Sequence, residues 1–211
     1  MGNDDQNTEQ KILASARVVF QQKGQSGARM QDIAKEAGIN QALLHYYFRT
    51  KEKLFQQVFE EDLFRFMSPL AAIISKPDID PETRITLIVD YYIDKLAQSP
   101  NIPLFIMQEL TSNPDRLVSL FQKIKEQNLY SSGLVMQDFI EQLEAGIREG
   151  RYKQIDPVQY IVSLISMCVY PFIARPLLKE VFQMDEQQFS EFLSRRKEEV
   201  TNYAFSILKK T

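Results

Sequence analysis

The sequence predicts an all-α protein, and three observations support this class. Glycine and proline are scarce, with 7 and 9 residues among 211, which disfavours a turn-rich all-β fold. Apolar residues recur at spacings of three and four along most of the chain, as they do on one face of a helix. No stretch alternates polar and apolar residues as a half-buried strand does. At 44% hydrophobic and 25% charged, the composition is that of a globular protein.

The first fifty residues predict three short helices. The first is expected from a cap at Asn7 or Thr8 to Gly24, followed by a loop at 24–27. The second ends at Gly38, because glycine favours the conformation that terminates a helix. Residues expected to face inward from these two helices are Ile12, Leu13, Ala16, Val19, Phe20, Met30, Ile33 and Ala34.

The third helix, 41–48, is expected to begin at a cap provided by Asn40. Thr50 then caps a longer helix that starts at Lys51. Two short helices joined by a tight glycine turn form the plan of a helix-turn-helix. Residues expected to face the core from the third and fourth helices are Leu44, Phe48, Leu54, Val58, Leu63 and Phe66.

Prolines divide the rest of the chain into further helical segments. Pro171 and Pro176 are expected to kink or interrupt one of them, and another is expected to bend near Ser131-Ser132-Gly133. The expected segments are 82–98, 102–111, 114–149, 157–180 and 185–209.

The stretch 157–174 contains no charged residue and approaches the length of a membrane span. It also contains Gln159, Ser163 and Ser166, together with two prolines, and no second such stretch follows. A helix that is apolar on all sides is buried. We therefore expect a core helix, covered partly by its own chain and partly by a second copy, and no membrane partner.

Several function classes are disfavoured. The single Cys168 excludes an internal disulfide, and the polar N-terminus lacks an apolar signal core, so a cytoplasmic protein is expected. The lone histidine, His45, has no second histidine or cysteine cluster with which to bind a metal. Cys168 lies in an apolar segment, where a small buried side chain is expected. We expect no enzyme, no metal and no cofactor.

Charge gives only weak support to nucleic-acid binding. The net charge of the chain is −3. Residues 1–53 contain eight Lys and Arg against six Asp and Glu, which gives +2. The positive charge of residues 1–53 has the sign expected of a DNA-binding segment, but it is small.

The stretch that says most about function is ARMQDIAKEAGINQALLHYYFRTKEKLF. It resembles the N-terminal DNA-binding segment of the TetR/AcrR family of bacterial transcriptional regulators. The matching positions are Ile33-Ala34, Ala37-Gly38, Leu44, Tyr46-Tyr47-Phe48 and Lys51-Glu52-Lys53-Leu54, with Thr50 in place of the usual Ser or Asn. One departure is Ala28-Arg29, where the family usually has a Ser or Thr that caps the second helix and reaches a phosphate.

The resemblance implies an Ω-shaped homodimer that binds palindromic operator DNA and responds to a small hydrophobic or amphipathic inducer. Residues 1–54 would form the DNA-binding domain, and 55–211 the ligand-binding and dimerisation domain. The dimer would form through 157–180 and 185–209. Repression is the expected mode, and activation is a variant. The alternative class is a helical ligand-binding or adaptor protein without specific DNA binding, motivated by the weak basic charge and the missing cap.

The expected DNA contacts lie around the third helix. Gln41 can pair bidentately with adenine, whereas the tyrosines and Lys51 suit phosphates. A core position remains open for His45, and packing against the first helix remains open for Tyr47. The full expected set is Arg29, Met30, Asn40, Gln41, Ala42, His45, Tyr46, Tyr47 and Lys51.

A ligand pocket is expected among aromatic and Met side chains of the larger domain, although each alone is more typical of plain core. Glu109 is the acid most embedded in apolar sequence, and it could meet a cationic ligand, pair with an Arg or face solvent. The expected lining is Tyr91, Tyr92, Phe105, Met107, Glu109, Phe121, Tyr130, Met136, Phe139, Met167 and Tyr170.

Overall fold

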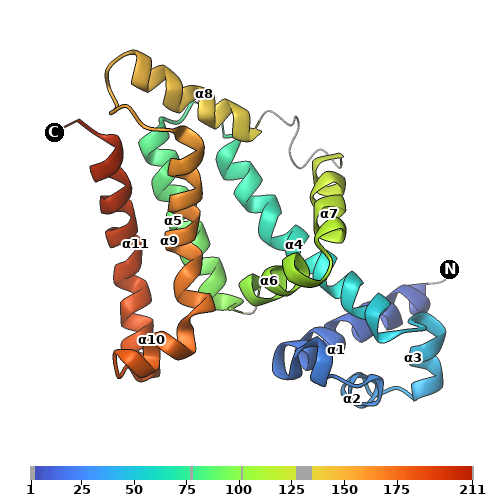
Figure 1. The fold of residues 1–211 in the computed structure, drawn as a ribbon. Helices are drawn as coiled ribbons and strands as arrows, with labels where there is room; N and C mark the ends of the chain where they lie inside the picture. Colours follow the sequence, from blue (N-terminus) through green and yellow to red (C-terminus); the bar gives the residue numbers. More distant parts are fainter. Residues whose placement is uncertain (1–2, 77, 101, 127–134, 211) are drawn as a thin grey trace. The chain divides into compact units, whose positions relative to one another are not determined.

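The computed structural model describes residues 3–76, 78–100, 102–126 and 135–210, with side chains except at 3, 4, 121, 123–126 and 135. Eleven α-helices make up most of this described chain (Figure 1). Strand-like pairing within it is limited to an isolated bridge between Tyr152 and Lys209. The prediction of an all-α fold is confirmed.

The chain divides into two compact units, Met1–Arg65 and Phe66–Thr211. The boundary falls inside α4 (Lys51–Ile74), further along this helix than the division after residue 54 expected from the sequence. Each unit has its own set of buried apolar side chains and is described separately below.

The first unit begins with α1 (Asn3–Gly27), which differs from the prediction at both ends. It starts before Asn7, where the Asp5 carboxylate accepts a hydrogen bond from the Tyr47 hydroxyl at 3.0 Å. Gly24 has a left-handed φ of 66°, so the helix is kinked there. The helix is interrupted at Gly24, as predicted, but residues 25–27 continue as a helical turn where a loop was predicted.

The turn between α2 (Met30–Glu36) and α3 (Gln41–Tyr47) forms as predicted. Gly38 has a φ of 63°, which glycine adopts at little cost. Its neighbour Ile39 donates its backbone N–H to the Ala34 carbonyl at 3.0 Å, which closes the end of α2. Asn40 Oδ1 accepts from the Leu43 N–H at 2.7 Å and caps α3.

α4 begins where the sequence predicts, because Thr50 Oγ1 accepts from the Lys53 N–H at 3.2 Å. The rings of Phe20 and Phe55 join α1 to α4 edge to face, with centroids 5.1 Å apart. Of the residues expected to face the core of the first unit, all but Met30 are buried: Ile12, Leu13, Ala16, Val19, Phe20, Ile33, Ala34, Leu44, Phe48, Leu54, Val58 and Leu63. Met30 is half-buried.

The second unit contains the end of α4 and seven further helices. Of these, α5, α9 and α11 lie side by side (Figure 1). Tyr160 on α9 donates its hydroxyl to the Ala204 carbonyl of α11 at 3.1 Å, and Arg196 Nη2 donates to the Met167 carbonyl at 3.1 Å. These pairings run in opposite directions along the sequence, so α9 and α11 are antiparallel. The seven helices are α5 (Pro81–Gln98), α6 (Ile102–Ser112), α7 (Pro114–Glu126), α8 (Val135–Arg148), α9 (Pro157–Ile173), α10 (Arg175–Val181) and α11 (Glu186–Leu208).

Three aspartates cap long helices of this unit. Asp80 accepts from the Thr83 N–H at 2.9 Å and from the Thr83 hydroxyl at 2.6 Å. These two hydrogen bonds lower the pKa of Asp80 from 3.8 to about 2. Asp156 caps α9 through the Val158 N–H at 2.8 Å, and Asp185 forms a capping box with Gln188 at the start of α11.

Two predicted segments are divided in the structure. The stretch 114–149 contains α7 and α8, and the expected bend at Ser131-Ser132-Gly133 lies outside the described residues. The stretch 157–180 breaks at Ala174, between α9 and α10, with a bend of 73°. Pro171 stays within α9, whereas Pro176 lies in the first turn of α10, where its missing N–H costs no hydrogen bond.

The apolar stretch of α9 packs into the core of the second unit, with Ile161, Leu164 and Phe172 buried. Among the described helices none is by itself long and apolar enough to cross a membrane, although the bent pair α9 and α10 together meets the test of length and composition. Cys168 is completely buried, as expected, and burial raises the pKa of its thiol to about 12.

Candidate nucleic-acid interface and ligand cavity

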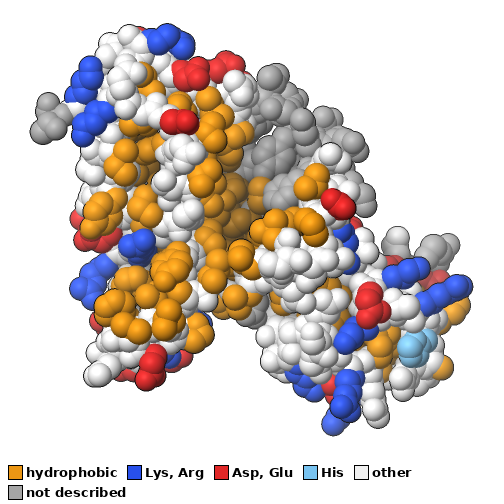
Figure 2. All heavy atoms as spheres, in the orientation of Figure 1, with side chains coloured by type: hydrophobic (Ala, Val, Ile, Leu, Met, Phe, Trp, Pro, Cys, Tyr) orange, Lys and Arg blue, Asp and Glu red, His pale blue; other side chains and the backbone are white. Residues whose placement is uncertain are grey.

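α3 is held by one face and leaves the other uncovered. Leu44 is fully buried beneath it, whereas Gln41, Ala42 and His45 are exposed. Tyr46 is the most exposed of the large hydrophobic side chains in the described part of the chain, with 78% of its surface exposed. Figure 2 shows the only histidine, in pale blue, at the surface near Lys and Arg side chains. His45 is therefore a surface residue, and the alternative that it lies in the core is wrong.

Two residues predicted to hold phosphates are engaged by the chain itself. Tyr47 is half-buried and donates its hydroxyl to Asp5 on α1, which agrees with the packing alternative left open for it. Burial and Asp5 raise the pKa of Tyr47. Lys51 Nζ lies 3.2 Å from the Ala28 carbonyl and 3.4 Å from the Ser26 carbonyl, so it ties the start of α4 to the segment before α2.

The start of α2 lacks a side-chain cap, as the Ala28-Arg29 departure predicts. Arg29 occupies the N-cap position without a capping hydrogen bond, and its side chain is exposed. Asp32 lies in the first turn of α2, where its negative charge interacts favourably with the positive end of the helix dipole. Lys23 donates to Asp32 at 2.8 Å, and this contact lowers the pKa of Asp32.

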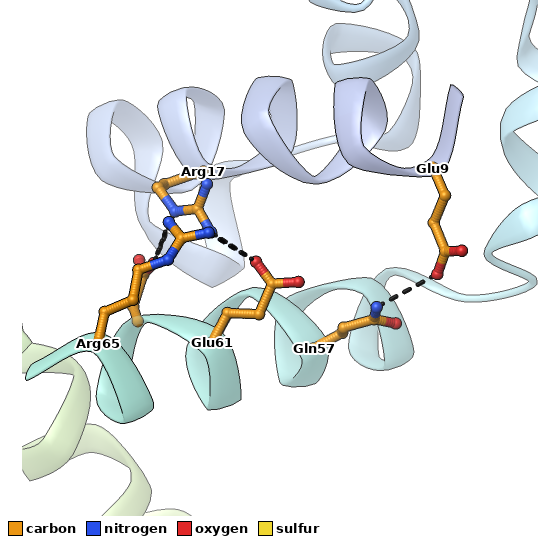
Figure 3. Close-up of polar contacts among 6 residues, drawn as sticks. Glu9, Arg17, Gln57, Glu61 and Arg65 are labelled. Carbon is orange, nitrogen blue, oxygen red and sulfur yellow. Dashed lines mark hydrogen bonds and ion pairs between the residues drawn. The ribbon is translucent and has the colours of Figure 1, made fainter. Parts of the chain in front are cut away.

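A row of polar contacts joins α1 to α4, and sequence reasoning did not find it (Figure 3). Arg17 donates to Asp62 at 2.6 Å and to Glu61 at 2.9 Å. Glu61 also accepts from Arg65 at 3.3 Å. The partners are 44 and 45 residues apart, with α2 and α3 between them in the chain, so no local spacing signals the contact. It fixes α4 against α1 within the first unit.

The second unit contains a partly open cavity of about 650 Å³. This volume lies in the range of small-molecule sites. The wall is almost entirely apolar and contains no Asp, Glu, Lys or Arg. Its residues are Phe66, Met67, Leu70 and Ile74 of α4; Ile88, Tyr92 and Leu96 of α5; Ile102, Pro103, Ile106, Met107 and Leu110 of α6; Met136 and Phe139 of α8; and Ile161, Leu164, Ile165, Ser166, Val169, Tyr170 and Ile173 of α9.

Five residues of the predicted lining lie in this wall: Tyr92, Met107, Met136, Phe139 and Tyr170. The sequence missed the aliphatic majority, because Ile and Leu at helical spacing look the same in a solid core and in a cavity wall. The Tyr130 position and the Phe121 side chain lie outside the described residues.

Four predicted lining residues lie elsewhere. Tyr91 turns its hydroxyl to the Phe66 carbonyl, 2.5 Å away, and burial raises its pKa to about 12. Glu109 is buried and accepts from Arg116 Nε at 2.7 Å, which is the ion-pair alternative left open for it. Phe105 and Met167 are half-buried and do not contribute to the wall.

The described residues contain no group of three or more His, Cys, Asp or Glu side chains placed to hold a metal ion. What the two units offer chemically is an uncovered polar helix face in the first and an uncharged apolar cavity in the second.

Comparisons with known proteins agree on the family. The model of the bacterial regulatory proteins of the tetR family matches residues 12–58. The HTH-type transcriptional regulator RutR of Escherichia coli O157:H7 is 31% identical over 159 residues, which cover 73% of this chain and 68% of RutR. A probable HTH-type transcriptional regulator of Bacillus subtilis, YttP, is 25% identical over 185 residues, covering 86% of this chain and 85% of YttP.

Solved structures share the fold. A TetR transcription regulator from Haloarcula marismortui superposes with a TM-score of 0.66 at 20% identity, covering 97% of this chain and all of the other. A regulator of the TetR/AcrR family from Thermobifida fusca gives 0.63 at 18% identity, covering 93% of this chain and 97% of the other. With the capped α2–α3 turn and the RutR match, these findings show that the chain belongs to the TetR family of bacterial transcriptional regulators.

Proposed function

We propose that the protein is a ligand-responsive transcriptional repressor that binds palindromic operator DNA as a homodimer and is released by a small apolar or amphipathic inducer. The observation that carries this proposal is the uncovered face of α3, where Gln41, Ala42 and His45 are exposed above the buried Leu44. A two-turn helix with short or flat outward side chains fits the major groove of B-DNA.

The proposed contacts divide into base and backbone readers. Gln41 reads a base edge, with Ala42 and His45 packing beside it, and Tyr46 contacts the sugar–phosphate wall. Arg29 and Met30 at the start of α2, together with Asn40 at the start of α3, complete the proposed interface. Tyr47 and Lys51 reach phosphates once DNA competes with their internal partners.

The second unit supplies the inducer site and the dimer contact in this proposal. The apolar cavity supports the first role. Exposed apolar side chains on α9, α10 and α11 support the second, and Figure 2 shows hydrophobic side chains gathered over α10. These exposed residues are Val158, Val162, Tyr170, Leu177, Val181, Phe182, Tyr203 and Ile207.

α4 is the proposed link between ligand and DNA. Its second half contributes Phe66, Met67 and Leu70 to the cavity wall, and its first half is fixed to α1 by Arg17. A ligand that prefers one arrangement of α4 shifts the population of dimers toward the one that does not match two successive major grooves, about 34–36 Å apart.

Selection of bound duplexes from a random DNA pool, followed by fluorescence anisotropy at two salt concentrations, tests DNA recognition. A palindromic consensus whose binding weakens steeply with salt is the expected result, because phosphate contacts release counterions. Absence of enrichment, with a protein shown to be free of co-purified small molecules by mass spectrometry, would reject operator recognition.

Light scattering of Val162→Glu tests the dimer. The added charge is expected to produce monomers, since a buried unpaired carboxylate is strongly unfavourable. Val118→Glu on α7 is the matched control, because Val118 is 56% exposed and Val162 55%. A dimer of unchanged stability in both variants would exclude the α9 face.

A further inference from the structure

Two charged side chains are buried among the described residues, and the chain treats them differently. Glu109, 1% exposed, is neutralised by Arg116, which donates through Nε and Nη2. Arg84, 2% exposed, receives no such partner: within the described chain no carboxylate lies within ion-pair distance of its guanidinium. A buried charge that lacks a counter-charge is costly to the folded state.

The polar contacts of Arg84 are all to neutral groups. Nη1 donates to Gln142 Oε1 at 2.6 Å, and Nη2 donates to the Lys76 carbonyl at 2.8 Å. Its Nε–H is buried without a hydrogen-bond partner among the described atoms. Burial lowers the pKa of Arg84, while the more distant Asp80 and Asp138 favour its charged form. The guanidinium thus has one nitrogen, Nε, without a hydrogen-bond partner, and its positive charge is compensated only by distant acids.

Arg84 packs against a residue of the cavity wall without itself belonging to that wall. Its Cζ is 5.5 Å from the ring centroid of Phe139, which belongs to the cavity wall. Ile88, one turn further along α5, also lines the cavity, as does Ile74, two residues before the Lys76 carbonyl that Arg84 contacts. The guanidinium thus packs on one residue of the cavity wall, Phe139, and its anchoring contacts lie close in sequence to two others.

We infer that the cavity takes an amphipathic carboxylate, with its aliphatic chain against the apolar wall and its carboxylate bound by Arg84. The inference rests on the proposed function, because it assigns a ligand class to the proposed inducer site. Rotation of Phe139 joins the cavity to the guanidinium, and the carboxylate then accepts from the spare Nε–H. The acids at Asp80 and Asp138 favour a head with a single charge over a phosphate.

Isothermal titration calorimetry with sodium dodecanoate and 1-dodecanol, each kept below its aggregation limit, tests this assignment on the wild-type protein. The two probes share a chain and differ in the head. We expect dodecanoate to bind roughly 10- to 100-fold more tightly, the range for a hydrogen bond to a charged group.

Substitutions test whether Arg84 is the residue that makes dodecanoate bind more tightly than 1-dodecanol. Arg84→Gln is expected to reduce the ratio of the two affinities to about one, whereas Arg84→Lys, which keeps the charge, retains part of it. Arg148→Gln removes an exposed cation from α8 and is the control that leaves the ratio unchanged. Circular dichroism checks folding of each variant, and the wild-type ratio decides even if Arg84→Gln does not fold.

Equal binding of both probes to the wild type would overturn the role of Arg84 and leave it as a structural tie between α5 and α8. Failure of both probes to bind would overturn the ligand class. Operator selection is measured on the same preparation: if a consensus duplex is bound while neither probe is, only this inference fails, and if neither DNA nor probe is bound, the proposed function fails as well.

Discussion

The two units are built from the same secondary structure but keep their functional features in opposite places. In Met1–Arg65 the candidate site is on the outside of α3, above buried apolar side chains. In Phe66–Thr211 the candidate site is the part of the interior that side chains leave empty. The difference shows that a helical core can either support a binding surface on its outside or contain a binding cavity within it.

Enlarging one side chain in each unit tests this contrast most directly. Ala34→Leu adds volume at a buried position of α2 and is expected to lower the free energy of unfolding by about 1–3 kcal/mol. Ile106→Phe adds volume beside the cavity and is expected to change it by less than about 0.5 kcal/mol. Urea unfolding followed by circular dichroism gives both values. Equal losses in the two variants would mean that the cavity does not persist in solution.

Substitutions on the outer side of the first unit separate base reading from support. Gln41→Ala is expected to cost about 1–3 kcal/mol for one base of the selected operator and to relax choice there. Lys51→Ala is expected to weaken binding to every duplex, because it removes a phosphate ligand and releases the Ser26 and Ala28 carbonyls. Anisotropy on operator variants measures both. Operator binding like that of the parent in both variants would show that α3 is not the recognition helix.

A cap in the second unit gives a smaller, pH-dependent effect. Asp80→Ala is expected to lower the free energy of unfolding by about 1 kcal/mol at neutral pH. The folded-state pKa of Asp80, about 2, is below its ordinary 3.8, so the ionised cap stabilises the fold above pH 3.8 and loses this effect as the pH falls towards 2. The difference in the free energy of unfolding between wild type and Asp80→Ala should therefore decrease as the pH falls from 3.8 to about 2. Glu180→Ala, at an exposed position on α10, is the control.

The smallest expected effect concerns the contact between Asp5 and Tyr47. Asp5→Asn keeps a hydrogen-bond acceptor for the Tyr47 hydroxyl but removes a negative charge beside the proposed phosphate site. Binding of a duplex is expected to strengthen about two- to fivefold, the size of one exposed charge interaction. Anisotropy at low salt measures the change, and Glu180→Gln makes the same change in net charge. Weaker binding of Asp5→Asn would show that the carboxylate positions Tyr47 for DNA.

Prediction from sequence succeeded where single residues dictate backbone geometry. Asn40, Gly38 and Thr50 each act on their own neighbours, so their roles could be assigned from residue type and spacing, and the structure confirms them. The exposure of His45 and Tyr46 followed from the same reasoning, since Leu44 and Phe48 already use the inner face of α3.

The cavity could be predicted only in part, because its outline depends on how several helices pack. Tyr91 and Tyr92 are adjacent in sequence, yet only the second lines the cavity, while the first meets the Phe66 carbonyl. The Arg17 contacts with Glu61 and Asp62 join residues 44 and 45 positions apart, and no local pattern encodes them. Such features require the coordinates of more than one helix.

The aliphatic wall of the cavity has a consequence for how this protein can change over evolutionary time. An exchange of Ile for Val or Leu at Ile88, Ile161 or Ile165 reshapes the space without leaving a polar group unsatisfied. The ligand preference of the proposed inducer site can therefore change through single substitutions that the fold tolerates. The α2–α3 turn has no comparable freedom, because Gly38 and Asn40 have few replacements. In the proposed function, one chain thus combines a DNA-binding turn that tolerates few substitutions with a ligand cavity that tolerates many.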